Sequence, residues 1–313
     1  MDFIFGSKET EKTTCLLDIA NQFIIDNKID RYNGYIILFT PPHSEVFDNL
    51  NINERNKNNY VFEQHLTSYD PNAKNNMDLI KGYSLSSASY AFGLINNFIE
   101  LSSKNKGIKL ILIDDITNII KPWVDEEIKK KQIILSKEKK HYDKNIYELL
   151  IYNEIFRYFL FQINSLQKLL QIPCIISLNI NISGNAHFIK NSPRIFNAIY
   201  SFVKNIFYLS KLDDGTIQYN YLELKLNQKT DKIIYKIKED ENNNDNSIIN
   251  KLFQEYVSKK IINKDLFPNI IFNNEWIRKS ISVFVKNINK YQIYQKQIEM
   301  NQKEDSSFSQ FDN

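Results

Sequence analysis

The segment Lys109-Leu-Ile-Leu-Ile-Asp-Asp115 constrains the fold more than any other part of the chain. Its apolar residues are continuous rather than alternating with polar ones, which is typical of a parallel strand covered on both faces. Parallel strands are joined by long crossover connections, most often helices. Because similar short apolar runs alternate with helix-like patterns along the chain, we predict an α/β fold with a mostly parallel central sheet flanked by helices.

The remaining patterns place the other elements. We expect further strands of the parallel sheet at residues 1–5, 35–39 and 173–178, and a short strand at residues 59–62. Helical periodicity begins at residue 13 and recurs at residues 87–101 and 148–170. Later segments alternate in the manner of a C-terminal antiparallel β-meander, at residues 205–209, 219–226 and 232–237.

Composition changes along the chain indicate its domain organisation. Residues 1–238 carry the α/β pattern, and residues 239–247 are a polar linker rich in Asn and Asp. We expect residues 248–302 to form a C-terminal helical extension and residues 303–313 to be a disordered tail. One stripe in the extension either packs on the chain's own core or docks a partner, and it consists of Ile277, Ile281, Phe284, Val285 and Ile288.

The bulk composition excludes several classes of protein. The chain has 313 residues, 42% of them hydrophobic, and a formal net charge of +3, which permits nucleic-acid contact without arguing for it. Its two cysteines, Cys15 and Cys174, lie in apolar runs and predict reduced core thiols. The four histidines have no ligand spacing, so we expect no structural metal. There is no secretory signal pattern and no apolar run of ~20 residues, so we expect a nuclear or cytosolic protein without membrane contact.

A candidate phosphate-binding loop, Gly6-Ser-Lys-Glu-Thr-Glu-Lys12-Thr13, follows the first expected strand. Such loops read Gly-x-x-x-x-Gly-Lys-[Ser/Thr] between a strand and a helix. Their backbone N–H groups and the helix N-terminus hold phosphates, the lysine reaches the β- and γ-oxygens, and the hydroxyl ligates Mg²⁺. Gly6, Lys12 and Thr13 have the required spacing. We therefore assign them, with the neighbouring Thr14, to nucleotide binding.

Glu11 stands where the motif has its second glycine. A glycine at that place lets the backbone approach the phosphates without a Cβ, whereas glutamate adds bulk and a negative charge beside a polyanion. Two like charges about 4 Å apart repel by about 1 kcal/mol in water and by several times that in a drier site. The loop either binds nucleotide weakly or is a vestigial turn in which Lys12 and Thr13 are solvated.

Asp114 is the second candidate ligand, because it follows the buried strand about one hundred residues after the loop. In P-loop ATPases an acidic residue at the tip of such a strand holds Mg²⁺. The alternative is that Asp114 and Asp115 merely end the strand and cap the following turn. We predict that Thr13 and Asp114 hold the metal.

Several segments, taken in order, resemble the RecA/RadA family of recombinases. FGSKETEKTT is similar to the family's phosphate loop, and KLILIDDITNIIK to its Mg²⁺-binding strand. FLFQINSLQKLLQIPCIISLNI resembles its next helix and strand, which usually ends in Thr-Asn-Gln where this chain has Ser177, Leu178 and Asn179. SPRIFNAIYSFVKNIFYLSK is similar to the approach to the closing β-meander. The resemblance covers residues 1–238 and implies a RecA-like P-loop ATPase core.

The resemblance also implies roles that this chain fills incompletely. The family's catalytic glutamate would fall near Thr40-Pro41-Pro42, and the only nearby carboxylate is Glu45, so Glu45 is the candidate catalytic residue. Asn179 is the candidate for the glutamine that senses the γ-phosphate, or else a cap at a strand end. The phosphate loop lies close to Met1, so we expect no preceding DNA-binding or polymerisation segment. ATP and Mg²⁺ are the implied cofactors, with weak or no hydrolysis.

Two regions correspond to the family's DNA-contacting loops, residues 121–147 and 181–194. The first holds eight lysines against five acids, a local balance of +3, and suits either phosphate neutralisation or a solvated charged helix. The second mixes basic, amide and aromatic residues, a mixture typical of single-strand binding that also occurs in ordinary polar loops. The candidate DNA-binding residues are Lys129, Lys130, Lys131, Lys190 and Arg194.

Taken together, these features predict a divergent recombinase paralogue. We expect an accessory protein of DNA repair and homologous recombination that works in a hetero-oligomer with other recombinase-like subunits. It would contact single-stranded or duplex DNA and be a weak DNA-dependent ATPase or a pseudo-ATPase. One alternative is a catalytically inactive RecA-fold structural subunit of a multiprotein complex, as in the Elongator complex. A stand-alone ATPase that uses Glu45 is another.

Overall fold

A computed structural model describes twelve stretches of the chain. They are residues 1–6, 12–30, 34–42, 63–65, 80–102, 107–138, 144–179, 199–203, 205–211, 217–227, 232–239 and 275–308.

The described strands form one nine-stranded sheet in the order β3-β4-β2-β5-β6-β1-β7-β8-β9. The six neighbours from β4 to β7 run parallel, whereas β3, β8 and β9 pair antiparallel at the two sides. The strands are β1 (Asp2–Gly6), β2 (Tyr35–Thr40), β3 (Glu63–His65), β4 (Ile80–Ser84), β5 (Ile108–Ile113), β6 (Cys174–Asn179), β7 (Asn205–Lys211), β8 (Ile217–Asn227) and β9 (Lys232–Glu239).

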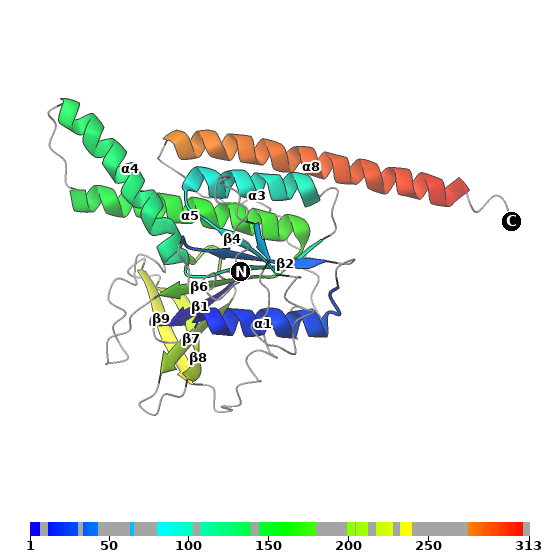
Figure 1. Ribbon diagram of the computed structural model, residues 1–313, viewed down its shortest axis with the longest axis horizontal. Coiled ribbons are helices and arrows are strands. Elements are labelled where there is room, and N and C mark those ends of the chain that lie inside the picture. Colours follow the sequence, from blue (N-terminus) through cyan, green and yellow to red (C-terminus); the bar gives the residue numbers. More distant parts are fainter. Residues whose placement is uncertain are drawn as a thin grey trace.

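Helices cover both faces of the parallel strands, which confirms the predicted α/β class (Figure 1). One face is covered by α1 (Lys12–Asp26). The other is covered by α3 (Ala88–Ser102), α4 (Ile116–Glu138) and α5 (Lys144–Leu170). The helix α8 (Glu275–Phe308) packs on α3 and α5, on the side away from the sheet (Figure 1). None of the described helices is long and apolar enough to cross a membrane.

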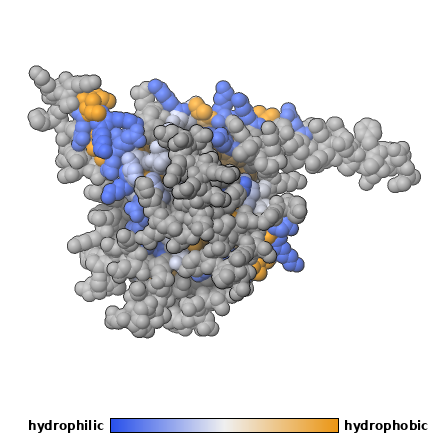
Figure 2. Space-filling view, viewed as in Figure 1, coloured by the Kyte–Doolittle hydropathy of each residue, from blue (hydrophilic) through white to orange (hydrophobic). Residues whose placement is uncertain are grey.

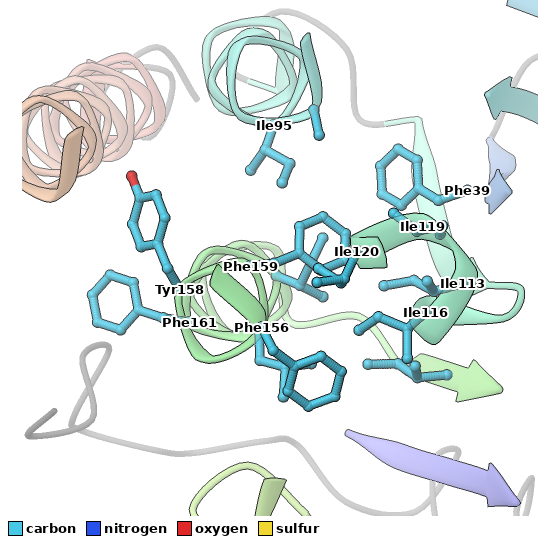
Figure 3. Packing of buried hydrophobic residues seen from close by; sticks show 14 of the residues in the cluster. Phe39, Ile95, Ile113, Ile116, Ile119, Ile120, Phe156, Tyr158, Phe159 and Phe161 are labelled. Carbon is cyan, nitrogen blue, oxygen red and sulfur yellow. The ribbon is translucent and has the colours of Figure 1, made fainter. Parts of the chain in front are cut away.

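The strand sequences explain why both faces are covered. In β1 every residue is buried, with Phe3 and Phe5 in the core on the side of α5 and Ile4 in the core on the side of α1. Fully burying one such side chain contributes roughly 1.5–3 kcal/mol. Figure 3 shows the larger core, in which Phe159 of α5 lies beside Ile120 of α4. A strand that buries alternate residues on opposite faces requires a layer on each side.

The strand order brings the ends of three strands to one edge. Because β6 lies between β1 and β5, the carboxyl ends of these parallel strands meet. Gly6 at the end of β1 is in register with Asn179 at the end of β6. Ile113 at the end of β5 pairs with Ile176, and residue 114 follows it immediately. We call this side of the sheet the carboxyl edge, and ligands of open α/β sheets bind outside such edges.

Residues 121–147 correspond to a loop in the family that the chain resembles, but both ends of this region are helical here. The helix α4 extends to Glu138 and α5 begins at Lys144, which agrees with the charged helix that the sequence left open. The outer part of α4 projects away from the body of the protein (Figure 1). Charged residues favour a solvated helix when they recur three and four positions apart, because opposite charges then pair along its surface.

Other boundaries also differ from the sequence patterns. The strand β4 was not expected, and the expected strand at residues 59–62 lies outside the described residues. The helix α8 continues to Phe308 and so includes residues 303–308, which we expected in the tail. The linker at residues 239–247 and residues 248–274 of the expected helical extension lie outside the described residues, apart from residue 239 in β9.

Candidate functional site

The carboxyl edge gathers polar side chains from α1 and from the ends of β5 and β6. Lys12 and Thr13 begin α1, Asp114 follows β5, and Ser177 and Asn179 end β6. The strand order places these three segments side by side although they are far apart in the sequence. We call Lys12, Thr13, Asp114 and Ser177 the edge cluster.

A chain of hydrogen bonds connects three members of the edge cluster. The Thr13 hydroxyl donates to Asp114 Oδ2 at 2.8 Å, and the Ser177 hydroxyl donates to Asp114 Oδ1 at 2.9 Å. Ser177 Oγ in turn accepts the backbone N–H of Asp115 at 2.7 Å. Asp114 also donates its own N–H to the Phe39 carbonyl at 2.8 Å, which ties the end of β5 to β2. The Asp114 carboxylate is therefore fixed in direction.

Lys12 is buried, with 5% of its surface exposed. Burial lowers the pKa of its ammonium group, and the carboxylates of Asp115 and Asp114 oppose that shift in this order. A buried ammonium is costly unless negative charge lies nearby. The position of Lys12 therefore excludes the alternative in which it is a solvated first-turn residue.

Asp114 is also buried, with 4% of its surface exposed. Burial raises the pKa of its carboxyl group, and the nearby charge of Asp115 raises it further. The hydrogen bonds from Thr13 and Ser177 and the charge of Lys12 act in the opposite direction and favour the carboxylate. A buried carboxylate with two hydroxyl donors and a lysine beside it has the chemistry of a metal or phosphate site.

Asp115 has a different role from Asp114. Its backbone φ is 48°, in the left-handed region that aspartate tolerates better than most residues. Its carboxylate accepts hydrogen bonds from the Asn118 backbone N–H at 3.3 Å and from the side chains of Thr117, Asn118 and Asn179. The capping alternative therefore describes Asp115, which immediately precedes α4, and does not describe Asp114.

Asn179 is turned toward Asp115 by this arrangement. Its side-chain amide donates to the Asp115 carboxylate, and its own surface is half-buried. A strand-end amide that bonds to the cap of α4 fits the expectation of a strand-end cap. It also links β6 to the start of α4, next to the edge cluster.

The structure describes only some of the remaining predicted residues. Gly6 ends β1, and Thr14 lies half-buried in the first turn of α1. Glu45, Lys190 and Arg194 lie outside the described residues, as does Glu11. Ser177 was considered only as part of a family motif, and its separation of 63 residues from Asp114 leaves no local signal of the contact.

The three candidate DNA-binding lysines of α4 lie on its projecting part. Lys129 and Lys130 are exposed and Lys131 is half-buried. The ammonium group of Lys130 lies 2.8 Å from a Glu126 oxygen and 2.9 Å from a Glu127 oxygen. Hydrogen bonds with Glu126 and Glu127 raise the pKa of Lys130. The acids one turn away thus neutralise part of the positive charge that the sequence suggested.

The edge cluster fits a magnesium–phosphate ligand better than a bare metal ion. Among the described residues there is no group of three or more His, Cys, Asp and Glu side chains that could hold a metal. Mg²⁺ uses one or two carboxylates together with substrate phosphates, and Thr13 and Asp114 supply that oxygen set. Lys12 and the N-terminus of α1 supply positive charge for phosphates.

No protein-family model matches this chain, and no curated protein matches it.

Proposed function

We propose that this chain is a divergent RecA-like P-loop protein that binds Mg²⁺–ATP at the carboxyl edge and hydrolyses it weakly or not at all. The observation that carries the proposal is the edge cluster itself. A buried Lys12, a Thr13 hydroxyl and a buried Asp114 meet at the carboxyl ends of parallel strands, with Thr13 bonded to Asp114. These are the residue types and the place in the fold that phosphate loops use.

Each member of the edge cluster has a role in this proposal. Lys12 and the N-terminal N–H groups of α1 would bind the phosphate oxygens, and Thr13 and Asp114 would hold Mg²⁺. Bound Mg²⁺ neutralises phosphate charge. Ser177 keeps the Asp114 carboxylate in position from the side of β6.

Weak hydrolysis follows from the carboxylates at the edge. Attack by water on a γ-phosphate needs a group that positions the water. Among the described residues that end the parallel strands, Asp114 and Asp115 are the acids, and both carboxylates already accept hydrogen bonds within the protein. Glu45 is the remaining candidate and lies outside the described residues. Glu11 beside Lys12 further weakens binding of a polyanion.

The fold supports the RecA-like part of the proposal. The strand β6 lies between the loop strand β1 and the acidic strand β5, and antiparallel strands β8 and β9 extend the sheet beyond β7. Together with the segment order of residues 1–238, this arrangement supports an accessory subunit that acts with other recombinase-like subunits on DNA in repair and recombination. That assignment of pathway rests on resemblance, because fold alone does not fix function.

The deciding measurement is calorimetric binding of Mg²⁺–ATP to the purified chain. We expect binding that requires Mg²⁺ and that weakens about 10- to 100-fold in Lys12→Met, since a charge-assisted hydrogen bond contributes roughly 1.5–3 kcal/mol. Lys12→Arg is the matched control, because it keeps the charge that balances Asp114. Circular dichroism of each variant establishes that it is folded. The absence of heat at millimolar ATP would overturn the proposal.

A nucleotide-free structural subunit is the second candidate function, and one observation favours it. Both oxygens of the Asp114 carboxylate already accept hydrogen bonds from Thr13 and Ser177, so the edge cluster is satisfied without a ligand. In that case the cluster stabilises the junction of α1, β5 and β6. Lys12→Met would then lower the free energy of unfolding, and the folded chain would not bind ATP.

A further inference from the structure

An unsatisfied buried hydroxyl lies at the carboxyl edge, on Thr40, the last residue of β2. On the described surface in Figure 2, hydrophilic side chains surround small hydrophobic patches and no broad apolar face stands out. The unusual group is inside the molecule instead. Thr40 is fully buried, and its Oγ1 has no hydrogen-bond partner among the described residues. Such a group destabilises the folded state and calls for a physical reason.

Thr40 faces the same side of the sheet as Asp114. Successive residues of a strand point to opposite faces. In β2, Leu38 lies in the core on the side of α1, and Phe39 lies in the larger core on the side of α5. Figure 3 shows Phe39 and Ile113 in that larger core. Thr40 and Asp114 each follow by one residue and therefore point toward α1, where the edge cluster lies.

Thr40 belongs to a row of polar residues that crosses three neighbouring strands. The registers of β2 with β5 and of β5 with β6 place Thr40, Asp114 and Ser177 side by side. Two positions earlier, each of these strands has a buried apolar residue in the core on the side of α1. The Ser177 hydroxyl bonds to Asp114 within the row. Thr40 is the member of the row whose side chain is left unsatisfied.

The residues after Thr40 remove the partner that a threonine at the end of an element often has. Such a hydroxyl commonly accepts a hydrogen bond from the backbone N–H two residues further along. Residues 41 and 42 are both proline, which has no N–H. Pro41 also restricts Thr40 to extended backbone, and the Leu85 N–H donates to the Thr40 carbonyl at 2.9 Å. The backbone of Thr40 is therefore fixed, while its hydroxyl remains open to a group from elsewhere.

Thr40 lies on the far side of Asp114 from the candidate phosphate loop. The strands follow one another in the order β2-β5-β6-β1, and the loop follows β1 at Gly6. Because neighbouring strands are about 4.8 Å apart, Thr40 is one strand spacing from Asp114 and three from Gly6. A phosphate chain that begins at the loop and binds Mg²⁺ through Thr13 and Asp114 would therefore direct its terminal group toward Thr40.

We propose that the Thr40 hydroxyl donates a hydrogen bond to the terminal phosphate of the bound nucleotide, so that the site distinguishes a triphosphate from a diphosphate. The inference rests on the proposed function, because it assigns a contact within the same site. A hydroxyl bonded to a phosphate oxygen makes a charge-assisted hydrogen bond, which is stronger than a neutral one. Asn179, the sequence-based candidate for this role, bonds instead to Asp115.

The test compares Thr40→Val with Thr40→Ser by calorimetry of the full chain with Mg²⁺–ATP and with Mg²⁺–ADP. Valine keeps the shape of threonine without the hydroxyl, and serine keeps the hydroxyl. Thr40→Val should bind Mg²⁺–ATP about 10- to 100-fold more weakly than the wild type, while its affinity for Mg²⁺–ADP changes by less than about 3-fold. Thr40→Ser should retain the preference for the triphosphate.

The midpoint of unfolding in urea, measured without nucleotide, is a second readout. Removal of a buried hydroxyl that has no partner should raise the midpoint of Thr40→Val by roughly 0.3–1 M. A hydroxyl with a purely structural role would give the opposite sign, because its removal would break a hydrogen bond. A lower midpoint in Thr40→Val would therefore contradict the proposal.

The binding results separate this inference from the proposed function. If the wild type and Thr40→Val bind Mg²⁺–ATP equally well, the role of Thr40 is overturned and the proposed function stands. Equal weakening of ATP and ADP binding in Thr40→Val would place the contact at the metal or the inner phosphates, and would also overturn the role in distinguishing the two nucleotides. No binding of Mg²⁺–ATP by the folded wild type would overturn both proposals.

Discussion

Two lysine-bearing helices on the same side of the sheet present their charges differently. In α4 five lysines are accompanied by four acids, and Lys130 lies within 3 Å of both Glu126 and Glu127. The helix α8 has six cations and four acids, but its acids lie at residues 275, 299, 304 and 305, so residues 276–298 carry five cations and no acid. Each lysine adds the same charge to the net charge of the chain. Charged residues three and four positions away on the helix determine how strong the electrostatic field of that lysine is at the surface of a partner.

The two helices also differ in how firmly they are held. The inner part of α4 is anchored by Trp123, whereas Ile133 and Ile134 near its outer end are 57% and 49% exposed. The helix α8 has Ile277, Phe284 and Ile288 buried in the larger core. A charged surface on an anchored helix loses less conformational freedom on binding, because only the cationic side chains become immobilised.

The largest expected effect tests the anchoring. Phe284→Ala should lower the free energy of unfolding by about 3–5 kcal/mol, because it removes a fully buried ring from the larger core. The matched change on α4, Ile134→Ala, should alter it by less than about 0.5 kcal/mol, as for most surface substitutions. Urea titration of both variants measures the difference. Equal losses would contradict the docking of α8 on the larger core.

The sequence predicted the parts of the fold that local patterns specify. The continuous apolar run of β5 and the helical period of α5 both specify burial within a few residues, and both elements are present. The strand β4 was missed because Lys81 and Gly82 interrupt its apolar pattern. Its strand pairing with β2 is a tertiary contact, and a short window of sequence does not encode it.

The sequence predicted which residues form the candidate site, but it did not predict their arrangement in space. Lys12, Thr13 and Asp114 followed from motif spacing, and the structure brings them together. That Asp114 is the buried carboxylate and Asp115 the helix cap depends on contacts with Ser177 and Asn179 across the sheet. Two adjacent aspartates in a sequence carry no information about which one faces inward.

The apolar stripe of α8 had two alternative interpretations in the sequence, and its burial in the structure decides between them. The sequence pattern singled out its apolar stripe as either core or docking surface, and the structure buries Ile277, Phe284 and Ile288 in the core. The exposed face of α8 can be identified only when the residues of its buried face are known. Three of the candidate DNA-binding lysines were predicted in α4 instead, because they are adjacent in the sequence.

A second prediction tests whether the acidic residues of α4 reduce the contact of its lysines with DNA. In the background of Lys286→Gln with Lys290→Gln, we would neutralise α4 by Asp125→Asn, Glu126→Gln and Glu127→Gln. Removing these acids frees Lys130 from its two ion pairs. The slope of log affinity for duplex DNA against log salt should become steeper by about 1, because one lysine is freed to contact a phosphate.

The control for this rescue is the same triple neutralisation combined with Lys129→Gln and Lys130→Gln, in which the slope should stay low. A slope that remains low in the rescued variant itself would show that orientation, and not local acid content, keeps α4 from nucleic acid. Both variants keep the buried faces of the two helices, so circular dichroism should be unchanged.

The smallest expected effect is a change in the free energy of unfolding that has opposite signs in the two helices. Lys130→Gln removes two exposed ion pairs and should lower the free energy of unfolding by a few tenths of a kcal/mol. Lys286→Gln removes a like charge four residues from Lys290 and should raise it by a similar amount. Urea titrations at low salt measure the difference between the two variants. In about 1 M salt the Debye length falls to about 3 Å, so both effects should vanish together. If the difference persists at high salt, it arises from side-chain packing, and the contrast between the helices is not one of charge.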